Sequence, residues 1–156
     1  MPELSDVLAY GGPGTAMSGP VVGALVPFVL GPLDFAAAAV SAGANTIGFY
    51  APCDLRIESV SWAAHVYMTG TNTVAIYKHT DVLGGEGGTA IKTATAITAA
   101  GRVEGASFAS SAARNVTKGQ CVALDLVLSG TGTYEDLCFV VMAYITGHAV
   151  ADVTAR

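Results

Sequence analysis

The stretch NTIGFYAPCDLRIESVSWAAHVYMT, residues 45–69, decides the fold. Apolar residues alternate with polar ones in its second half, as they do in a β-strand with one buried face. Leu55 and Ile57 share one face, and the apolar residues from Val60 onward have the opposite parity. One extra residue in a strand produces such a change of parity, so we predict a β-bulge or bend at Glu58–Ser59.

Further strand patterns follow this stretch, separated by turns rich in Gly and Thr. We expect strands over residues 71–79, 90–98, 120–128 and 137–146, with a segment near 102–108 pairing with 90–98. The last strand is apolar on both faces, which predicts that both faces are covered. One face carries Leu137, Phe139, Val141 and Ile145, and the other carries Cys138, Val140, Met142 and Tyr144. About seven strands at this spacing indicate an all-β protein, an antiparallel, jelly-roll-like β-sandwich.

Residues 1–44 have a different composition, with five of the six prolines and only three charged side chains. The pieces GGPG, SGP and GPL exclude a long helix and would break a central strand. The segment is also too apolar for a solvated tail. We therefore predict an extended arm over 1–44, lying on its own sandwich or on a neighbouring subunit, with a short alanine-rich helix at Asp34–Ala42. The sandwich would span 45–150, followed by a tail over 151–156.

The composition of the chain argues against several classes of function. Apolar residues make up 52% of the chain and charged residues only 12%, about half of the usual ~25%. A net charge of -5 without a basic cluster argues against nucleic acid as a ligand. The most apolar run, Val21–Leu30, is interrupted by Gly and Pro, so no membrane span is predicted, and the acidic N-terminus does not resemble a secretory signal. A surface this poor in charge is expected to contact copies of itself or other proteins.

No group of residues has the spacing of an enzyme site, so we expect no catalytic residues, cofactor or metal. His79 and Asp81 would offer a metal only two ligands from one loop. Glu135 and Asp136 are adjacent on a strand and point to opposite faces, so a solvated edge is the preferred interpretation over acid–base chemistry. The odd number of cysteines, Cys53, Cys121 and Cys138, without metal spacing predicts reduced, buried thiols.

Several segments resemble small structural proteins of tailed-bacteriophage heads. They are GFYAPCDLRIESVSW, the following TG turn, GGTAIKT, NVTKGQCVALDL and FVVMAYI, and together they extend over about two thirds of the chain. The group is similar to capsid decoration, or cement, proteins, which commonly form trimers on the outer surface of the head and join neighbouring major capsid subunits. The resemblance implies a homotrimer, a virion location after synthesis in the host cytoplasm, and no catalytic residues. The long apolar arm departs from the shorter N-termini of this group.

The leading hypothesis is therefore a virion structural protein that decorates and stabilises a phage capsid by bridging major capsid subunits. A receptor- or glycan-binding module of a phage particle is the alternative, and it would require exposed aromatic residues in loops. An enzyme ranks third. The arm and the last strand supply the candidate partner-binding residues: Val21, Val22, Leu25, Val26, Phe28, Leu30, Phe35, Val140, Met142 and Tyr144.

Overall fold

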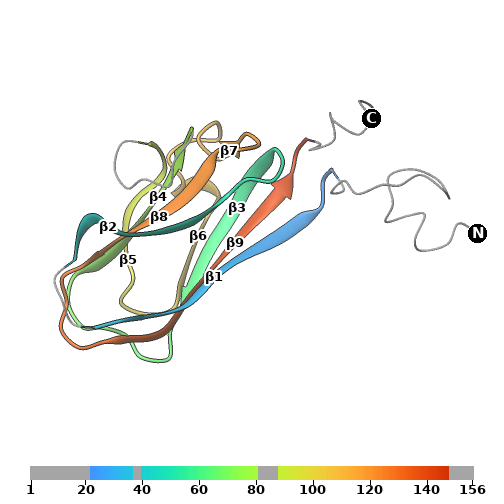
Figure 1. Cartoon of the computed structure of the whole chain (residues 1–156). Coiled ribbons are helices and arrows are strands. Elements are labelled where there is room, and N and C mark those ends of the chain that lie inside the picture. Colours follow the sequence, from blue (N-terminus) through green and yellow to red (C-terminus); the bar gives the residue numbers. More distant parts are fainter. Residues whose placement is uncertain (1–21, 37–39, 81–87, 148–156) are drawn as a thin grey trace, which may run out of the picture.

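The chain folds into two antiparallel β-sheets packed face to face, as a computed structural model shows (Figure 1). The structure describes residues 22–36, 40–80 and 88–147, without the side chains of 40–46. The strands are β1 (Leu25–Phe35), β2 (Val40–Tyr50), β3 (Leu55–Ala63), β4 (Asn72–His79), β5 (Thr89–Ala96), β6 (Gly101–Glu104), β7 (Asn115–Val116), β8 (Cys121–Leu128) and β9 (Tyr134–Ile145). A single 3-10 turn, η1 (Gly105–Ser107), is the one helical segment in these ranges.

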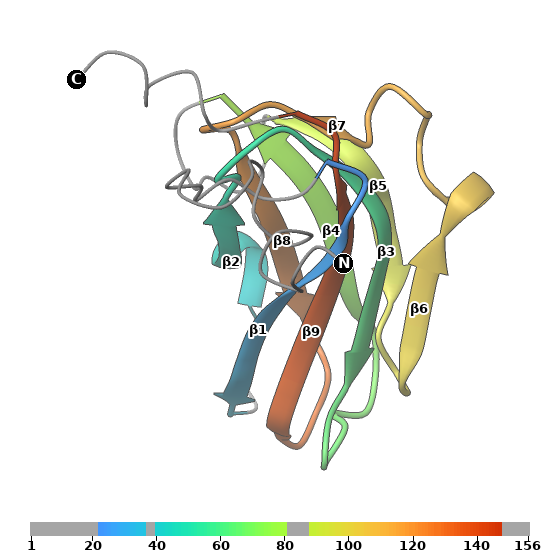
Figure 2. The ribbon, with the colours of Figure 1, turned by 90° about the vertical axis from the view of Figure 1, so that its right-hand side faces the viewer.

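The order of the strands is that of a jelly roll. One sheet runs β1-β9-β3-β6, with the short β7 also paired to β3, and the other runs β2-β8-β4-β5. Consecutive strands alternate between the two sheets from β1 to β4, and β1–β2 lies alongside β9–β8. Figure 2 shows β1, β9, β3 and β6 side by side in this order. The predicted all-β, jelly-roll-like sandwich is thus confirmed.

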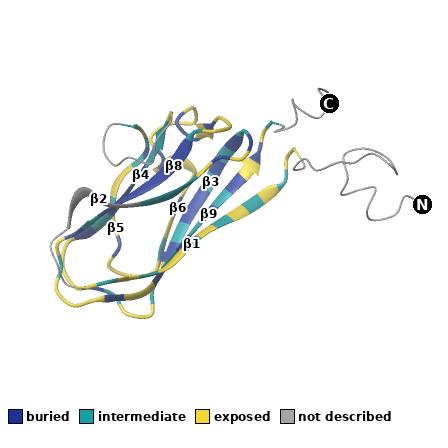
Figure 3. Cartoon of the chain, in the orientation of Figure 1, coloured by how far each residue is buried: buried dark blue, intermediate teal, exposed yellow. Residues whose placement is uncertain are grey.

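The core lies between the inner faces of the two sheets (Figure 3). Its largest fully buried side chains come from β3, β4, β5, β8 and β9 and from the β3–β4 and β5–β6 connections. On β9 only one face contributes: Leu137, Phe139, Val141 and Ile145 are buried, whereas Cys138, Val140 and Met142 are half-buried and Tyr144 is exposed. The alternation follows from the period of two along a strand.

The bulge predicted from the change of parity is confirmed. β3 pairs with β9 from Leu55 to Ala63, and the register shifts between Ile57 and Ser59. The extra residue returns Val60 and Trp62 to the core side, where both are buried. One pairing prediction is wrong: the segment at 102–108 was expected beside β5, but β6 pairs with β3 in the other sheet.

The described part of the predicted arm belongs to the sandwich. Residues 25–35 form β1, which pairs with β9 along most of its length, and residue 45 lies inside β2, which pairs with β8. The boundary expected at residue 45 therefore divides a strand. The helix expected at Asp34–Ala42 is wrong, because Asp34 and Phe35 end β1 and Val40 starts β2. The prolines are tolerated because β1 is an edge strand, which can lack some backbone donors.

Candidate interaction surface

The outer surface of the first sheet carries a row of apolar side chains along β1 and β9. We call it the β1/β9 face: Leu25, Pro27, Val29, Cys138, Val140, Met142 and Tyr144. Three of these residues on β1 lie directly opposite three on β9: Leu25 opposite Tyr144, Pro27 opposite Met142, and Val29 opposite Val140. Directly opposed residues share a face of a sheet, so the row is continuous across both strands.

The β1/β9 face is open to solvent in the single chain. Val29 is 59% exposed, Leu25 45% and Tyr144 38%, which is high for side chains of this size. Figure 3 shows β1 alternating between exposed and half-buried residues along its length. Scattered apolar residues are normal on a protein surface, but a contiguous row on neighbouring strands makes this face the candidate interaction surface.

The two ends of the β1/β9 face carry opposite charge. At one end Arg56 of β3 lies opposite Tyr144, with its guanidinium donating to the Ser111 hydroxyl at 3.4 Å. At the other end Asp34 and Asp136 are exposed, and the Asp136 backbone N–H donates to Asp34 Oδ1 at 2.9 Å. Within the described ranges Arg56 forms no ion pair. In the part of the chain that the structure describes, the basic group paired with the Asp136 carboxylate is His65, at 3.9 Å, and both of these side chains are largely exposed.

A shallow hollow interrupts the face near its acidic end. It has a volume of about 240 Å³ and is lined by Ser61, Trp62, Ala63, Cys138 and Val140. The lining is mostly apolar, and Trp62 is held beneath it by donating its indole N–H to the Ala99 carbonyl at 2.8 Å. The hollow is therefore a firm apolar surface of a size that suits one inserted side chain.

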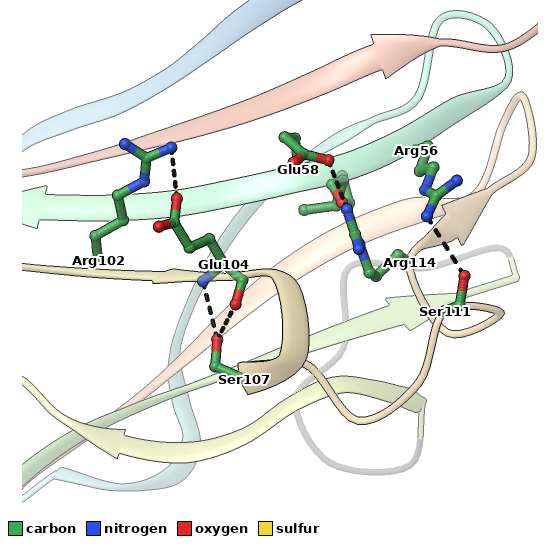
Figure 4. Close-up of polar contacts among 8 residues, drawn as sticks. Arg56, Glu58, Arg102, Glu104, Ser107, Ser111 and Arg114 are labelled. Carbon is green, nitrogen blue, oxygen red and sulfur yellow. Dashed lines mark hydrogen bonds and ion pairs between the residues drawn. The ribbon is translucent and has the colours of Figure 1, made fainter.

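The neighbouring strands β3 and β6 carry a polar border beside the apolar row. Figure 4 shows Arg102 paired with Glu104, and Arg114 paired with Glu58, at 2.7 and 2.6 Å. The Arg102–Glu104 pair is exposed on both sides, whereas the Arg114 side chain is only 9% exposed. An apolar centre beside a charged, solvated rim is the usual composition of a protein–protein interface.

The structure divides the predicted partner-binding residues into two groups. Val22, Leu25, Val140, Met142 and Tyr144 face outward, and all but Val22 belong to the β1/β9 face. Val26, Phe28, Leu30 and Phe35 are half-buried and pack against the core of their own sandwich. Val21 lies outside the described residues. Pro27 and Val29 were not predicted from the sequence to share a surface with the last strand. Their spacing of two residues from Leu25 and from each other could have indicated it, because such residues share a face of a strand.

The inward residues of β1, which also include Leu33, close one open side of the sandwich. The Phe28 ring stacks on that of Phe49, with centroids 4.0 Å apart and planes 6° from parallel. Phe28 lies on β1 and Phe49 on β2, so the stack joins the edge strands of the two sheets. The apolar character of this segment is thus explained in part by intramolecular packing.

A second, acidic hollow lies at the end of the sandwich where β1 ends and β9 begins. It has a volume of about 570 Å³ and is lined by Asp34, Phe35, Ala36, Thr133, Tyr134, Glu135 and Asp136. Glu135 and Asp136 are both exposed there, and the Glu135 carbonyl accepts from the His65 backbone N–H at 2.9 Å. Among the described residues, no three His, Cys, Asp or Glu side chains are placed to hold a metal ion. His79 is half-buried, while Asp81 and His148 lie outside the described residues.

Three ionisable side chains that are buried in the protein have raised pKa values: Cys53, Cys121 and Tyr134. Burial raises the pKa of the Cys53 and Cys121 thiols, and the Asp54 carboxylate adds to the effect at Cys53. Burial also raises the pKa of Tyr134 to about 12, and its hydroxyl donates to the Ile97 carbonyl at 2.7 Å. Cys53, Cys121 and Cys138 are free thiols, but Cys138 is only half-buried, on the outer face, which corrects the expectation of a buried thiol there.

Comparisons with known proteins give little guidance. No protein-family model and no curated protein matches the sequence. The fold is weakly similar to a chain in the structure of infectious bursal disease virus, Gx strain, with a TM-score of 0.30 and 11% identity. The match covers 87% of this chain and 42% of the viral chain, so this chain spans less than half of that protein's length. A likeness this distant assigns neither family nor function. In the described ranges there is also no helix with the length and hydropathy needed to cross a bilayer.

Proposed function

We propose that the chain is a structural protein of a phage virion, which decorates the outer surface of the capsid and bridges neighbouring major capsid subunits as a homo-oligomer. The observation that carries the proposal is the exposed β1/β9 face, a contiguous apolar row on a rigid sheet. A contiguous exposed row of this kind is typical of a surface that another protein covers. The resemblance of the strand and turn motifs to head proteins supplies the class of that partner.

The jelly roll suits this role because its sheets hold the exposed side chains in fixed positions. β9 is paired on both sides, by β1 and β3, so the row does not have to be ordered when a partner binds. Each contact would bury apolar surface worth roughly 25 cal/mol per Å². Symmetric repetition over a shell then multiplies many modest contacts into a stable coat.

The loops of the described residues do not favour the receptor- or glycan-binding alternative. Tyr134, the aromatic residue expected inside a turn, is fully buried. Tyr67, in the β3–β4 connection, is half-buried, and its ring packs edge-on against that of Tyr134 at 6.0 Å. Aromatic stacking platforms for sugar rings would have to stand free of such contacts.

Co-sedimentation of the purified chain with shells of the cognate major capsid protein tests the proposal. We expect saturable binding at a fixed ratio to capsid subunits and a higher melting temperature of the decorated shells. Val29→Asp should lower occupancy, because it places a charge in the apolar row. Tyr50→Asp is the matched control, since Tyr50 is similarly exposed (54%) on β2 of the other sheet. Absence of binding by the wild-type chain would overturn the proposed function.

A further inference from the structure

We infer that the β1/β9 face binds the same face of a second copy of this chain, with the strands of the two copies running in opposite directions across a two-fold axis. The inference deepens the proposed function, because it names the partner that covers the face on which that function rests. It differs from the trimer that the resemblance implies. Three features support this dimer: the prolines at the edge of β1, the shape of the β1/β9 face, and the distribution of charge on this face.

The edge of β1 is poorly suited to adding a strand from a partner. Pro27 and Pro32 lie within β1 and have no backbone N–H to donate. The register of β1 with β9 also shifts between Leu30 and Phe35, which distorts the edge further. Prolines and irregularities of this kind protect edge strands from edge-to-edge pairing. A partner that binds at β1 therefore uses the side-chain face of the sheet and not the edge of this strand.

The shape of the face is complementary to itself. Tyr144 stands exposed near one end, and the hollow at Cys138 and Val140 lies four to six residues away along β9. At about 3.4 Å per residue, this separation is roughly 13–20 Å. A two-fold axis crossing β9 between the two, near Met142, places the Tyr144 side chain of each copy over the hollow of the other.

The charges favour the same arrangement. Arg56 lies beside Tyr144, and Asp34 and Asp136 lie beyond the hollow at the opposite end of the face. With strands antiparallel across the contact, Arg56 of each copy lies at the level of Val140 of the other, four residues (140 − 136) from Asp136 along the strands, whereas with strands parallel the separation is eight residues (144 − 136). With strands parallel, like charges would meet, which costs free energy in an interface. In a two-fold symmetric contact, the pairing of the Arg56 end of one copy with the acidic end of the other occurs twice.

Sedimentation equilibrium of the full chain tests the inference with charge-reversed variants. One variant is Arg56→Glu, and the other is the double variant Asp34→Lys with Asp136→Asn, since asparagine tolerates the positive φ of 55° at residue 136. We expect the wild-type chain to dimerise and each variant alone to show a dimer Kd raised about tenfold or more. Mixing the two variants should restore dimers, because in the mixed pair both ends again meet opposite charges.

Further variants distinguish the contribution of the apolar contact to dimerisation from that of the charged ends, and from an effect on folding. Val29→Asp should abolish dimers, while Tyr50→Asp on the other sheet should leave them intact, with circular dichroism confirming the fold of each variant. A monomeric wild-type chain, an oligomer that Val29→Asp leaves unchanged, or a mixture of charge variants that stays monomeric would each overturn the inference. Shell binding is measured separately: dimers without shell binding would refute only the proposed function, and shell binding by a monomer only this inference.

Discussion

At the scale of single residues, Arg114 explains how the bulge in β3 is held. Its Nε donates to the Ile57 carbonyl at 2.7 Å, and its own carbonyl accepts the Ile57 backbone N–H at 3.0 Å. Its Nη2 donates to Glu58 (Figure 4), and the guanidinium lies over the Phe108 ring at 5.3 Å. The residue before the register shift therefore finds its hydrogen bonds in the loop that carries Arg114. This buried cation satisfies backbone groups that the shifted ladder leaves free.

Replacing Arg114 should therefore be costly. We expect Arg114→Met to lower the free energy of unfolding by about 2–4 kcal/mol, because it leaves Glu58 and the Ile57 carbonyl without their partner. Urea denaturation measures the change. Arg102→Met is the matched control: it breaks the exposed pair with Glu104 and should cost less than about 1 kcal/mol. Equal effects of the two substitutions would show that the clamp at the bulge contributes no more than a surface ion pair.

Tyr134 leads to a second prediction, on pH. Its pKa is about 12 in the folded chain, against about 10 when unfolded. The unfolded chain loses this proton first as the pH rises, so the stabilisation is complete below pH 10 and is lost between pH 10 and 12. The loss amounts to about 2–3 kcal/mol for this side chain. Urea midpoints from pH 9 to 12 should fall less steeply in Tyr134→Phe, while the contribution of Cys53 and Cys121 stays the same in both proteins.

At the scale of elements, local patterns predicted the strands but not their distant partners. The bulge at Glu58–Ser59 and the inner face of β9 could be predicted because they depend on period-two alternation alone. The residues of β1 predict an arm because proline and glycine dominate their neighbourhood, and because the partner strand β9 lies far away in the sequence. The alanines after Asp34 favoured a helix, but pairing of β1 and β2 with β9 and β8 overrides that weak preference.

The candidate site was predictable only in part for the same reason. The outward residues of β9 were identified because the strand is apolar on both faces. Those of β1 could be assigned to the same surface only once the register joined Val29 to Val140. The opposite charges of the two ends depend on this register and on the bulge, and the register is not specified by any local pattern.

The two faces of β1 should respond differently to substitution. Phe28→Ala is expected to lower the free energy of unfolding by about 2 kcal/mol, less than for a fully buried ring, because it removes the stack with Phe49 at the open side of the sandwich. Val29→Ala, on the outward face of the same strand, should change stability by less than about 0.5 kcal/mol in the monomer. Thermal unfolding at low protein concentration distinguishes the two. Similar losses would mean that β1 does not present separate inner and outer faces.

At the scale of the whole molecule, the jelly-roll topology makes β1 and the start of β2 part of the sandwich itself. Deletion of residues 2–44 would remove all of β1 and the start of β2, which are the outer strands of both sheets. We expect this variant to lose its cooperative unfolding transition. Deletion of residues 2–21 leaves every described strand in place and should keep the transition, as circular dichroism during heating would show. If the 2–44 deletion variant folds cooperatively, β1 and the start of β2 are dispensable for the sandwich.

The pairing of β1 with β9 also bears on how the chain is made. β1 is synthesised before its partner β9: Phe139, which lies opposite Leu30, follows it by 109 residues (139 − 30). At about 5–20 residues per second, the nascent segment waits on the order of ten seconds for that strand. During that interval Phe28 and its apolar neighbours have no sheet to join. The first sheet is thus completed only once β9 has been synthesised, and a chaperone that holds emerging hydrophobic segments has this interval in which to bind β1.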